Sequence, residues 1–285
     1  MNIAISGATG FIGGKLCSFL TERGDVVTPL GRTLFDDEHR GDLQKKIEQA
    51  DVVINLSGEP ILCHWSRENR ERILASRVIT TRLLVNAINR APRPTLLISA
   101  SAIDYYPTRG RHSEDSYECG RGFLYEVIRA WEEEALKLRF SCRLVIARLG
   151  IVFDREQGAF PAISMGRYLH ISTTIGSLKR HISWIDIDDL LRATALVIDN
   201  EQLHGVVNIV APRPTPYKEL IAALRLRYSI WLTIPIPKLA LWMIYGGAAQ
   251  VVYNNHSIYP KRLAENGFEY QSPDIESFIN RISST

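Results

Sequence analysis

Asn2-Ile3-Ala4-Ile5 is a short apolar run that leads directly into Ser6-Gly7-Ala8-Thr9-Gly10-Phe11-Ile12-Gly13, and this stretch decides the fold. The pattern predicts a strand, a glycine turn and a helix over residues 11–20. Gly7 can take a positive φ in the turn, Gly10 lets an anion approach the backbone, and Gly13 lets the helix pack close to its strand. The free N–H groups at the start of the helix suit a pyrophosphate. The spacing G-x-x-G-x-x-G is a variant of the fingerprint G-x-G-x-x-G, so it predicts a dinucleotide site, with a tight turn that binds nothing as the alternative.

The composition is that of an ordinary soluble globular protein, with 46% hydrophobic and 23% charged residues in a chain of 285. The net charge of +3 is mild and no run of five Lys or Arg occurs, so no nucleic-acid partner is expected. The cysteines form no C-x-x-C pair and the histidines no H-x-x-x-H, which predicts reduced thiols, a cytoplasmic location and no metal site. The N-terminus has no basic segment before its apolar run, so we interpret it as a strand and not a signal peptide.

Two later strand ends carry candidate cofactor contacts. Residues 26–30 are predicted to form the second strand, and Arg32 lies just beyond its end. At that place a carboxylate would bind the ribose 2′-OH of NAD, whereas an arginine accommodates the 2′-phosphate of NADP. Arg32 therefore favours NADP(H), with an exposed loop arginine as the alternative. Residues 51–56 form a continuous apolar run typical of a central strand, and the small residues Ser57 and Gly58 at its end would let backbone lie against the cofactor.

Hydroxyl groups follow the predicted fourth strand, residues 95–99. Ser99, Ser101, Tyr105 and Tyr106 lie at or beyond its carboxyl end, which in an open α/β sheet borders the ligand crevice. They are interpreted either as ligands for a carbonyl or sugar, or as ordinary turn residues.

Two helices flank that strand along the chain. The first, over residues 66–91, has a predicted apolar stripe of Ile73, Ile79, Leu83, Ala87 and Ile88. On the second, over residues 122–139, Tyr125 and Arg129 are four residues apart and therefore neighbours, facing either the crevice or water.

The repeated alternation of strands and helices predicts an α/β fold with a Rossmann-type doubly wound parallel sheet and a smaller, interleaved C-terminal substrate lobe. Residues 1–150 are assigned to an NADP-binding domain, with a later contribution from about 182–210. Residues 151–181 and 211–285 are assigned to the substrate lobe.

Residues 230–252 are mostly apolar and need a separate interpretation. Pro235, Pro237, Lys238, Gly246 and Gly247 interrupt the segment, and its charge-free part is too short to span a bilayer. We predict a buried or interface helix there and not a membrane anchor.

With these pieces in place, the chain resembles the extended short-chain dehydrogenase/reductase superfamily, and within it the atypical epimerase-family proteins sometimes labelled cell-division inhibitors. The shared motifs are residues 6–13, Asn55-Leu56-Ser57-Gly58-Glu59-Pro60-Ile61, Ser76-Arg77 with Thr80-Thr81, residues 99–106, Trp131-Glu132, Arg148-Leu149-Gly150, residues 183–189, Ala211-Pro212, and residues 260–263 with Gly267-Phe268. The resemblance covers nearly the whole chain and implies a Rossmann-type fold that binds NADP(H). The candidate cofactor-binding residues are Gly7, Thr9, Gly10, Phe11, Ile12, Gly13, Arg32, Ser57, Gly58, Arg77 and Ser99.

The sequence departs from the group at three places. Tyr106-Pro107 replaces the usual Tyr-Gly, Asp186 replaces a usual His, and residues 178–180 replace an expected Gly-Arg-Gln. The last of these puts any substrate contact carried over at that place in doubt.

The larger superfamily uses Ser, Tyr and Lys, the last two spaced as Y-x-x-x-K, whereas here Tyr125 is followed by Arg129. The resemblance makes Ser101, Tyr125 and Arg129 the catalytic candidates. A tyrosine needs a nearby positive charge to act as a base at neutral pH, and Arg129 is placed to supply it. Ser101 would hydrogen-bond a developing oxyanion. Because a guanidinium is larger and planar, it does not reproduce the superfamily's lysine, and a surface Tyr–Arg stack is the alternative.

Two functions therefore stay open. The first is an NADP(H)-dependent oxidoreductase or epimerase acting on a small carbonyl or sugar-like substrate. The second is a non-catalytic NADP(H)-binding regulatory or interaction protein. We expect a small-molecule substrate, no membrane partner and no nucleic acid, and a homodimer is left open.

Overall fold

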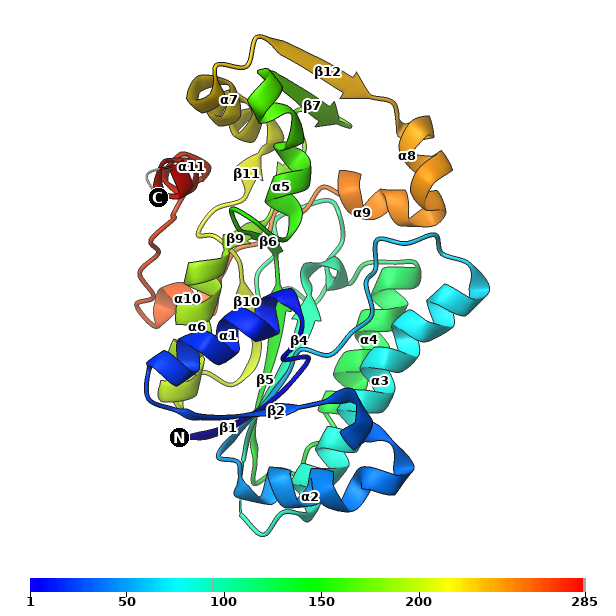
Figure 1. The fold of residues 1–285 in the computed structure, drawn as a ribbon, viewed down its shortest axis with the longest axis vertical. Helices are drawn as coiled ribbons and strands as arrows, with labels where there is room; N and C mark the ends of the chain where they lie inside the picture. The colour runs from blue at the N-terminus through cyan, green and yellow to red at the C-terminus, as the bar shows by residue number, and fades with distance from the viewer. Residues whose placement is uncertain (94, 284–285) are drawn as a thin grey trace.

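The computed structural model describes residues 1–93 and 95–283, and its centre is one parallel sheet of six strands (Figure 1). The strands are β1 (Asn2–Ser6), β2 (Val26–Leu30), β3 (Val52–Asn55), β4 (Leu96–Ala102), β5 (Arg143–Leu149) and β10 (Gly205–Ile209). Their order across the sheet is β10-β5-β4-β3-β1-β2. The chain places β2 on one side of β1 and then returns to lay β3 on the other side. The switch point of the sheet therefore lies between β1 and β3, where α/β folds place ligands.

The residues of each strand fit its place in the sheet. All four side chains of β3 are buried, as expected for a central strand covered on both faces. Pro29 lies in β2, which is an edge strand, so its missing N–H group costs no hydrogen bond to a further strand.

Helices cover both faces of the sheet. On one face, α1 (Phe11–Glu22) and α6 (Ile187–Asp199) pack against Ile3 and Ile5 of β1. On the other, α2 (Arg40–Gln49) and α3 (Arg67–Arg90) pack against Ala4 of the same strand. The helix α4 (Phe123–Ala135) lies beside α3 and β4. Successive side chains of β1 thus face opposite sides of the sheet, as in any β-strand. Because helices cover both faces of a parallel sheet, the predicted doubly wound α/β fold is confirmed.

A second, smaller lobe lies beyond the carboxyl ends of the strands, at the top of Figure 1. Its strands are β6 (Ile151–Phe153), β7 (Ile171–Ile175), β8 (His181–Ile182), β9 (Trp184–Asp186), β11 (Thr215–Pro216) and β12 (Leu232–Ile236). They pair as β6 with β9, β8 with β11, and β7 with β12. The helices of the C-terminal part are α5 (Ala159–Ile163), α7 (Tyr217–Tyr228), α8 (Lys238–Tyr245), α9 (Ala249–Tyr253), α10 (Lys261–Glu265) and α11 (Ile275–Ser283). Short 3-10 helices are η1 (Arg32–Phe35), η2 (Asp37–His39), η3 (Ile103–Tyr105), η4 (Met165–Leu169) and η5 (Gly246–Ala248).

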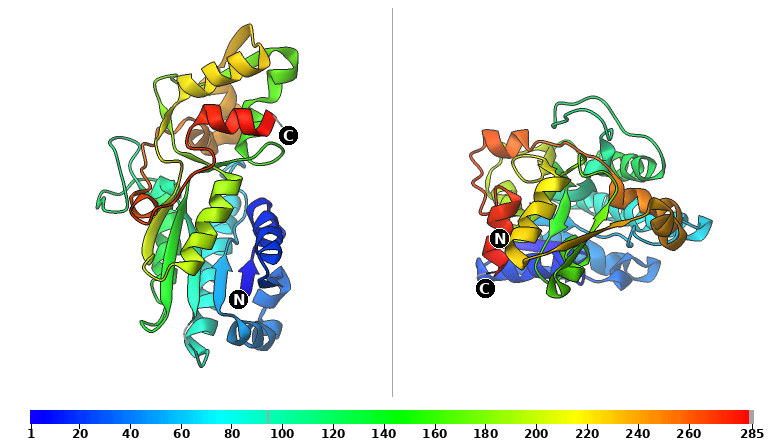
Figure 2. Two further views of the ribbon diagram at one scale, coloured as in Figure 1. Left: turned by 90° about the vertical axis from the view of Figure 1, so that its left-hand side faces the viewer. Right: turned by 90° about the horizontal axis from the view of Figure 1, so that it is seen from above.

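An aromatic cluster forms the core of this lobe. Phe153, Phe160, Trp184 and Phe278 lie with neighbouring ring centroids 5.0 to 5.8 Å apart. Phe278 comes from α11, which packs against α7, as the left view of Figure 2 shows. The C-terminal helix therefore completes the core of the lobe.

The chain passes between the two lobes more than once. After β9, both α6 and β10 join the central sheet, and Leu263 and Phe268 later pack on the same core. The predicted division at residue 150, with 182–210 returning to the first domain, remains a prediction.

Two predictions about apolar segments are wrong. Ile79 is exposed on α3, and Thr81 is buried there instead. Residues 230–252 do not form one buried helix, because they make β12, α8 and α9, and most large side chains of α8 are exposed. The prediction of an interface there stays untested. Within the described part of the chain, no helix has the length and apolar character needed to cross a bilayer.

The glycine turn sets the distance between α1 and β1. Gly7 has a φ of +73°, and a Cβ on it would lie 2.7 Å from the carbonyl oxygen of Leu56. A Cβ on Gly13 would lie only 2.1 Å from the carbonyl oxygen of Gly7. Only glycine therefore fits at position 13 while α1 keeps its place.

Gly13→Ala should lower the free energy of unfolding by about 3 kcal/mol, because the colliding atom is backbone and cannot rotate away. The neighbouring Gly14→Ala is the matched control, since its Cβ would meet the Ala8 oxygen at an ordinary 3.6 Å. On helix propensity alone the control should gain up to about 1 kcal/mol. Urea unfolding of both variants tests this, and equal stability of the two would contradict it.

Candidate functional site

The start of α1 is arranged to receive an anion. Gly10 donates its N–H to the carbonyl oxygen of Gly7 at 3.0 Å, and α1 begins at the next residue, Phe11. Among the described residues no side chain caps this helix, and its first turn holds no acidic residue. The first N–H groups of a helix have no partner within it, so those at Phe11 and Ile12 are left for a ligand.

A buried hydrogen-bond network fixes where β3 ends. Ser6 donates to the Asn55 side-chain oxygen at 2.7 Å, and the Asn55 amide donates to Thr81 Oγ1 at 2.8 Å. The Ser57 N–H donates to the same Asn55 oxygen at 3.3 Å. Because Ser6, Asn55 and Thr81 are fully buried, the network holds β1, β3 and α3 in one register, and it places Ser57 beside the turn. Sequence analysis missed this role of Asn55 and Thr81.

Arg77 supports the backbone that follows β3. Its guanidinium donates to the carbonyl oxygens of Ile73 and Glu59, each at 3.0 Å. It also packs on Gly58, where a Cβ would lie 2.8 Å from Arg77 Cζ. Burial lowers the pKa of Arg77 to about 10, although the charge of Glu59 opposes the shift. Gly58 is therefore needed for Arg77 to pack here, and a cofactor contact from either residue remains a prediction.

Arg32 lies just past β2 with its side chain 90% exposed. Its guanidinium is 3.3 Å from one carboxylate oxygen of Glu59, and the other oxygen is 3.6 Å from Arg72 of α3. Two cations from different elements thus converge on one carboxylate at the surface. Sequence analysis found Arg32 and missed Arg72, because nothing local indicates that α3 approaches the end of β2.

The predicted catalytic Ser101 is engaged in a buried ion-pair cluster. Its hydroxyl donates to Glu132 of α4 at 2.5 Å. The same carboxylate accepts two hydrogen bonds from Arg148 of β5, at 2.9 and 2.7 Å. Burial acts to lower the pKa of Arg148, but the hydrogen bonds and charge of Glu132 outweigh it and raise that pKa. Ser99, two residues before Ser101 and therefore on the same face of β4, is also buried.

A tyrosine links this cluster to Tyr125. The Arg148 guanidinium lies 3.4 Å from the centre of the Tyr105 ring, whose centroid is 5.7 Å from that of Tyr125. Ser101 therefore connects to Tyr125 through Glu132, Arg148 and Tyr105. Glu132 and Arg148 lie in two of the shared motifs, but the sequence did not indicate their role, because they lie 31 and 47 positions after Ser101.

Tyr125 and Arg129 are neighbours on α4, but Arg129 does not face the cavity beside Tyr125. The Arg129 side chain is exposed, 3.7 Å from Glu133. A hydrogen bond with Cys119 and partial burial raise the pKa of Tyr125 to about 12, while the charge of Arg129 lowers it only in part. The charge of Arg129 thus acts in the expected direction, but the net shift of the Tyr125 pKa is upward, and the catalytic role of the two residues remains a prediction.

A cavity of about 580 Å³ lies beside Tyr125, lined also by Tyr106, Asp104 and His256. Asp104 accepts a hydrogen bond from Asn254 at 2.8 Å and lies 3.3 Å from His256 Nε2. Burial acts to raise the pKa of Asp104, but His256 and Asn254 outweigh it, so the carboxyl stays ionised. The arrangement suits a polar ligand.

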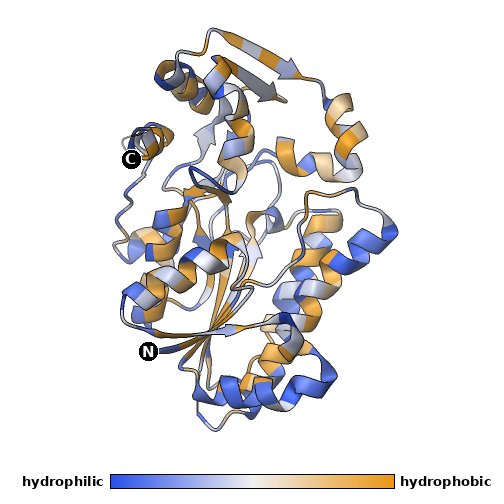
Figure 3. Cartoon of the chain, viewed as in Figure 1, coloured by the Kyte–Doolittle hydropathy of each residue, from blue (hydrophilic) through white to orange (hydrophobic). Residues whose placement is uncertain are grey.

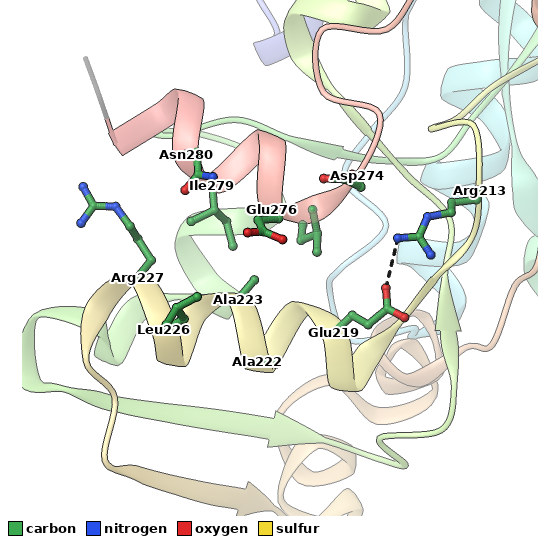
Figure 4. Close-up of a pocket in the computed structure, with 11 residues that line it drawn as sticks. Arg213, Glu219, Ala222, Ala223, Leu226, Arg227, Asp274, Glu276, Ile279 and Asn280 are labelled. Atoms are coloured by element: carbon green, nitrogen blue, oxygen red, sulfur yellow. Dashed lines mark ion pairs between the residues drawn. The ribbon is translucent and has the colours of Figure 1, made fainter.

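Another hollow, of about 520 Å³, lies between α7 and α11 (Figure 4). Its residues include the ion pair of Arg213 and Glu219, at 3.6 Å, and it contains none of the predicted site residues. It is therefore separate from the glycine turn and from the cavity at Tyr125.

Comparison with known proteins agrees with this geometry. Residues 3–210 match the family described as NAD dependent epimerase/dehydratase family, and residues 236–282 match a domain of unknown function, DUF1731. The chain is 31% identical to the Epimerase family protein SDR39U1 homolog, chloroplastic, of Arabidopsis thaliana, over 99% of this chain and 86% of that one. It is 29% identical to the Epimerase family protein YfhF of Bacillus subtilis, over 99% and 98% of the two chains.

A solved structure is similar over its whole length. The crystal structure of human epimerase family protein SDR39U1 (isoform 2) with NADPH has a TM-score of 0.90 and 27% identity, and covers 100% of both chains. The predicted resemblance is thereby confirmed, and the chain belongs to the NAD-dependent epimerase/dehydratase family.

Proposed function

We propose that the chain binds NADP(H) across the carboxyl ends of β1 and β3 and acts on a small carbonyl or sugar-like substrate as an oxidoreductase or epimerase. The observation that carries the proposal is the uncapped start of α1 behind the glycine turn, with Arg32 at the end of the adjacent β2. The similar human protein crystallised with NADPH supports the same cofactor.

The pyrophosphate would lie at the N–H groups of Phe11, Ile12 and Gly13, with Gly10 allowing close approach. Lys15 is not free to meet it, because its ammonium is paired with Asp154 at 2.7 Å. Binding there would therefore depend on the helix start and not on a side-chain cation. Thr9 and the backbone of Ser57 and Gly58 would border the same groove.

The 2′-phosphate would take the place that the Glu59 carboxylate holds between Arg32 and Arg72. Arg32 is exposed enough to leave Glu59 at little cost, and a phosphate offers it a stronger partner than a surface carboxylate does. Glu59 would then turn toward Arg72 or solvent.

Hydride exchange at the substrate carbon is the chemistry that a bound NADP(H) supplies. A proton at the substrate oxygen must come from the chain, and Tyr125 supplies from α4 one of the hydroxyl groups that line the cavity. With a pKa of about 12 its phenol stays protonated at neutral pH, so it suits a proton donor and not a base. Ser101 and Arg148 would act as positioning residues, because they connect to Tyr125 through Glu132 and Tyr105.

A second candidate function is non-catalytic NADP(H) binding. The arrangement of the predicted catalytic residues favours it, since Arg129 faces solvent and the Ser101 hydroxyl is held by Glu132. In that case NADP(H) would bind without turnover, and its occupancy would serve to regulate another contact.

Arg32→Ala should weaken NADPH binding at least about tenfold and leave NADH binding nearly unchanged, since a charge-assisted contact contributes about 1.5–3 kcal/mol. Arg67→Ala is the control, because Arg67 is an exposed arginine of α3 that pairs with Glu71 instead. Fluorescence titration of both cofactors into all three proteins gives the answer. Equal affinities of the parent for NADPH and NADH would refute the 2′-phosphate assignment.

Tyr125→Phe should keep NADPH affinity and lower turnover by about 10² to 10⁴, the usual effect of losing a general acid. Arg129→Gln, one turn along the same helix, should retain the parent rate. Oxidation of NADPH is followed with a set of small aldehydes, ketones and sugar-like carbonyls. An unchanged rate in Tyr125→Phe would remove Tyr125 from the chemistry, and binding without turnover of any compound would favour the second candidate function.

A further inference from the structure

The outer end of the second lobe exposes a large apolar surface, formed by η4, β7, β12 and α8 and here called the distal surface. These elements lie at one end of the long axis of the molecule (Figure 1), and α8 is largely orange in the hydropathy colouring of Figure 3. Tyr168, Leu169, Trp231, Leu239, Trp242 and Met243 are each 59–77% exposed. An isolated exposed apolar residue needs no explanation, whereas a contiguous set marks an interaction site.

The small sheet of β7 and β12 has its apolar face turned outward. Ser172 and Thr174 of β7 are buried, and the Ser172 hydroxyl lies 2.9 Å from the Thr233 hydroxyl. Leu232 and Ile234, the alternate residues of β12, are exposed. A sheet with one solvated face normally shows the opposite pattern, polar outward and apolar inward. The outward face is therefore suited to meet an apolar phase.

The parts of the distal surface are joined along the chain and across the sheet. Leu232 pairs with Ile171 in parallel register, and Trp231 donates its N–H to the carbonyl oxygen of His170 at 3.1 Å. The 3-10 helix η4 packs against β7, and α8 starts two residues after β12 ends. The elements that carry the exposed apolar side chains are thus linked at the same end of the second lobe.

The two chain segments that contain the distal surface carry positively charged side chains and no negatively charged ones. Residues 157–185 and 220–264 contain no Asp or Glu, although the whole chain has 31. They contribute Arg167, Lys179, Arg225 and Lys238 among their cations. Exposed apolar side chains in segments that are basic and free of acidic residues complement an anionic lipid surface.

We propose that the distal surface docks on an anionic bilayer, with the apolar side chains of α8 entering the boundary between headgroups and acyl chains. Trp231, Trp242 and Tyr168 have the amphipathic rings that favour this boundary. At eight residues, α8 lies in the membrane surface and does not cross it. The segments that form the distal surface offer a second copy only cations and no carboxylate to pair with them, so the charge favours lipid over a homodimer. The proposal revises the expectation of no membrane partner.

Binding to vesicles tests the proposal without any cofactor, so its outcome is independent of the proposed function. The full chain is sedimented with vesicles of pure phosphatidylcholine, or with about 30% phosphatidylglycerol added. We expect at least about a tenfold higher partition coefficient on the anionic vesicles, reduced by high salt but not abolished, because the apolar contact persists.

The double variant Trp242→Gln/Met243→Gln should lose at least about tenfold in partition, because it removes the inserting side chains. Phe140→Gln is the matched control, since Phe140 is fully exposed and lies just after α4, outside the distal surface. Circular dichroism and NADPH titration, expected to be unchanged, establish that the variants are folded.

No binding by the parent, or undiminished binding by the double variant, would overturn the proposal. Sedimentation equilibrium tests whether a second copy of the chain, and not a bilayer, covers the distal surface. A parent that dimerises with concentration without binding vesicles, and a double variant that stays monomeric, would assign the distal surface to a second copy of the chain.

Discussion

The close approach of α1 to the end of β1 is the constraint on which the proposed cofactor site depends. Gly13 lies so near the Gly7 carbonyl that no side chain fits between them, and Gly7 itself takes a left-handed φ beneath Leu56. The start of α1 therefore points its N–H groups over the ends of β1 and β3. The anion site is a result of packing, because the same contact that seats the helix on the sheet also positions its free donors.

Buried polar groups then fix the second half of the site. Ser6, Asn55 and Thr81 satisfy one another between β1, β3 and α3, and Glu132 and Arg148 do so between α4 and β5. An ion pair in the interior gains little net stability over apolar packing, but removing one partner leaves a costly charge. We attribute to the Glu132–Arg148 pair a positional role, since it holds Ser101 from one side and the Tyr105 ring from the other.

The parts that could be predicted from sequence are those with local signals. The glycine turn, the apolar runs of β1 and β3, and Arg32 just past β2 each carry their signal within a few residues. The catalytic arrangement could not be predicted, because Ser101 meets Glu132 and Arg148 only through the packing of α4 on the sheet. Helical spacing correctly made Tyr125 and Arg129 neighbours, yet it could not say that Arg129 faces solvent. The prediction of a buried helix over residues 230–252 was wrong for a related reason, since hydropathy does not reveal which apolar surface a fold leaves exposed.

The orientation of the second lobe over the sheet depends on two carboxylates at the start of α6. Asp189 accepts the N–H groups of Gln271 and Ser272 at 2.8 and 2.9 Å, and Asp186 accepts from Ser272 and from Arg281 of α11. Burial raises the pKa of Asp186, while the hydrogen bond from Ser272 and the charge of Arg281 oppose that shift and stabilise the carboxylate. Asp186 thereby ties α11 directly to the start of α6. Because α11 also completes the aromatic core of the lobe, this link fixes the core relative to the sheet and leaves β12 and α8 as the outermost elements at the far end.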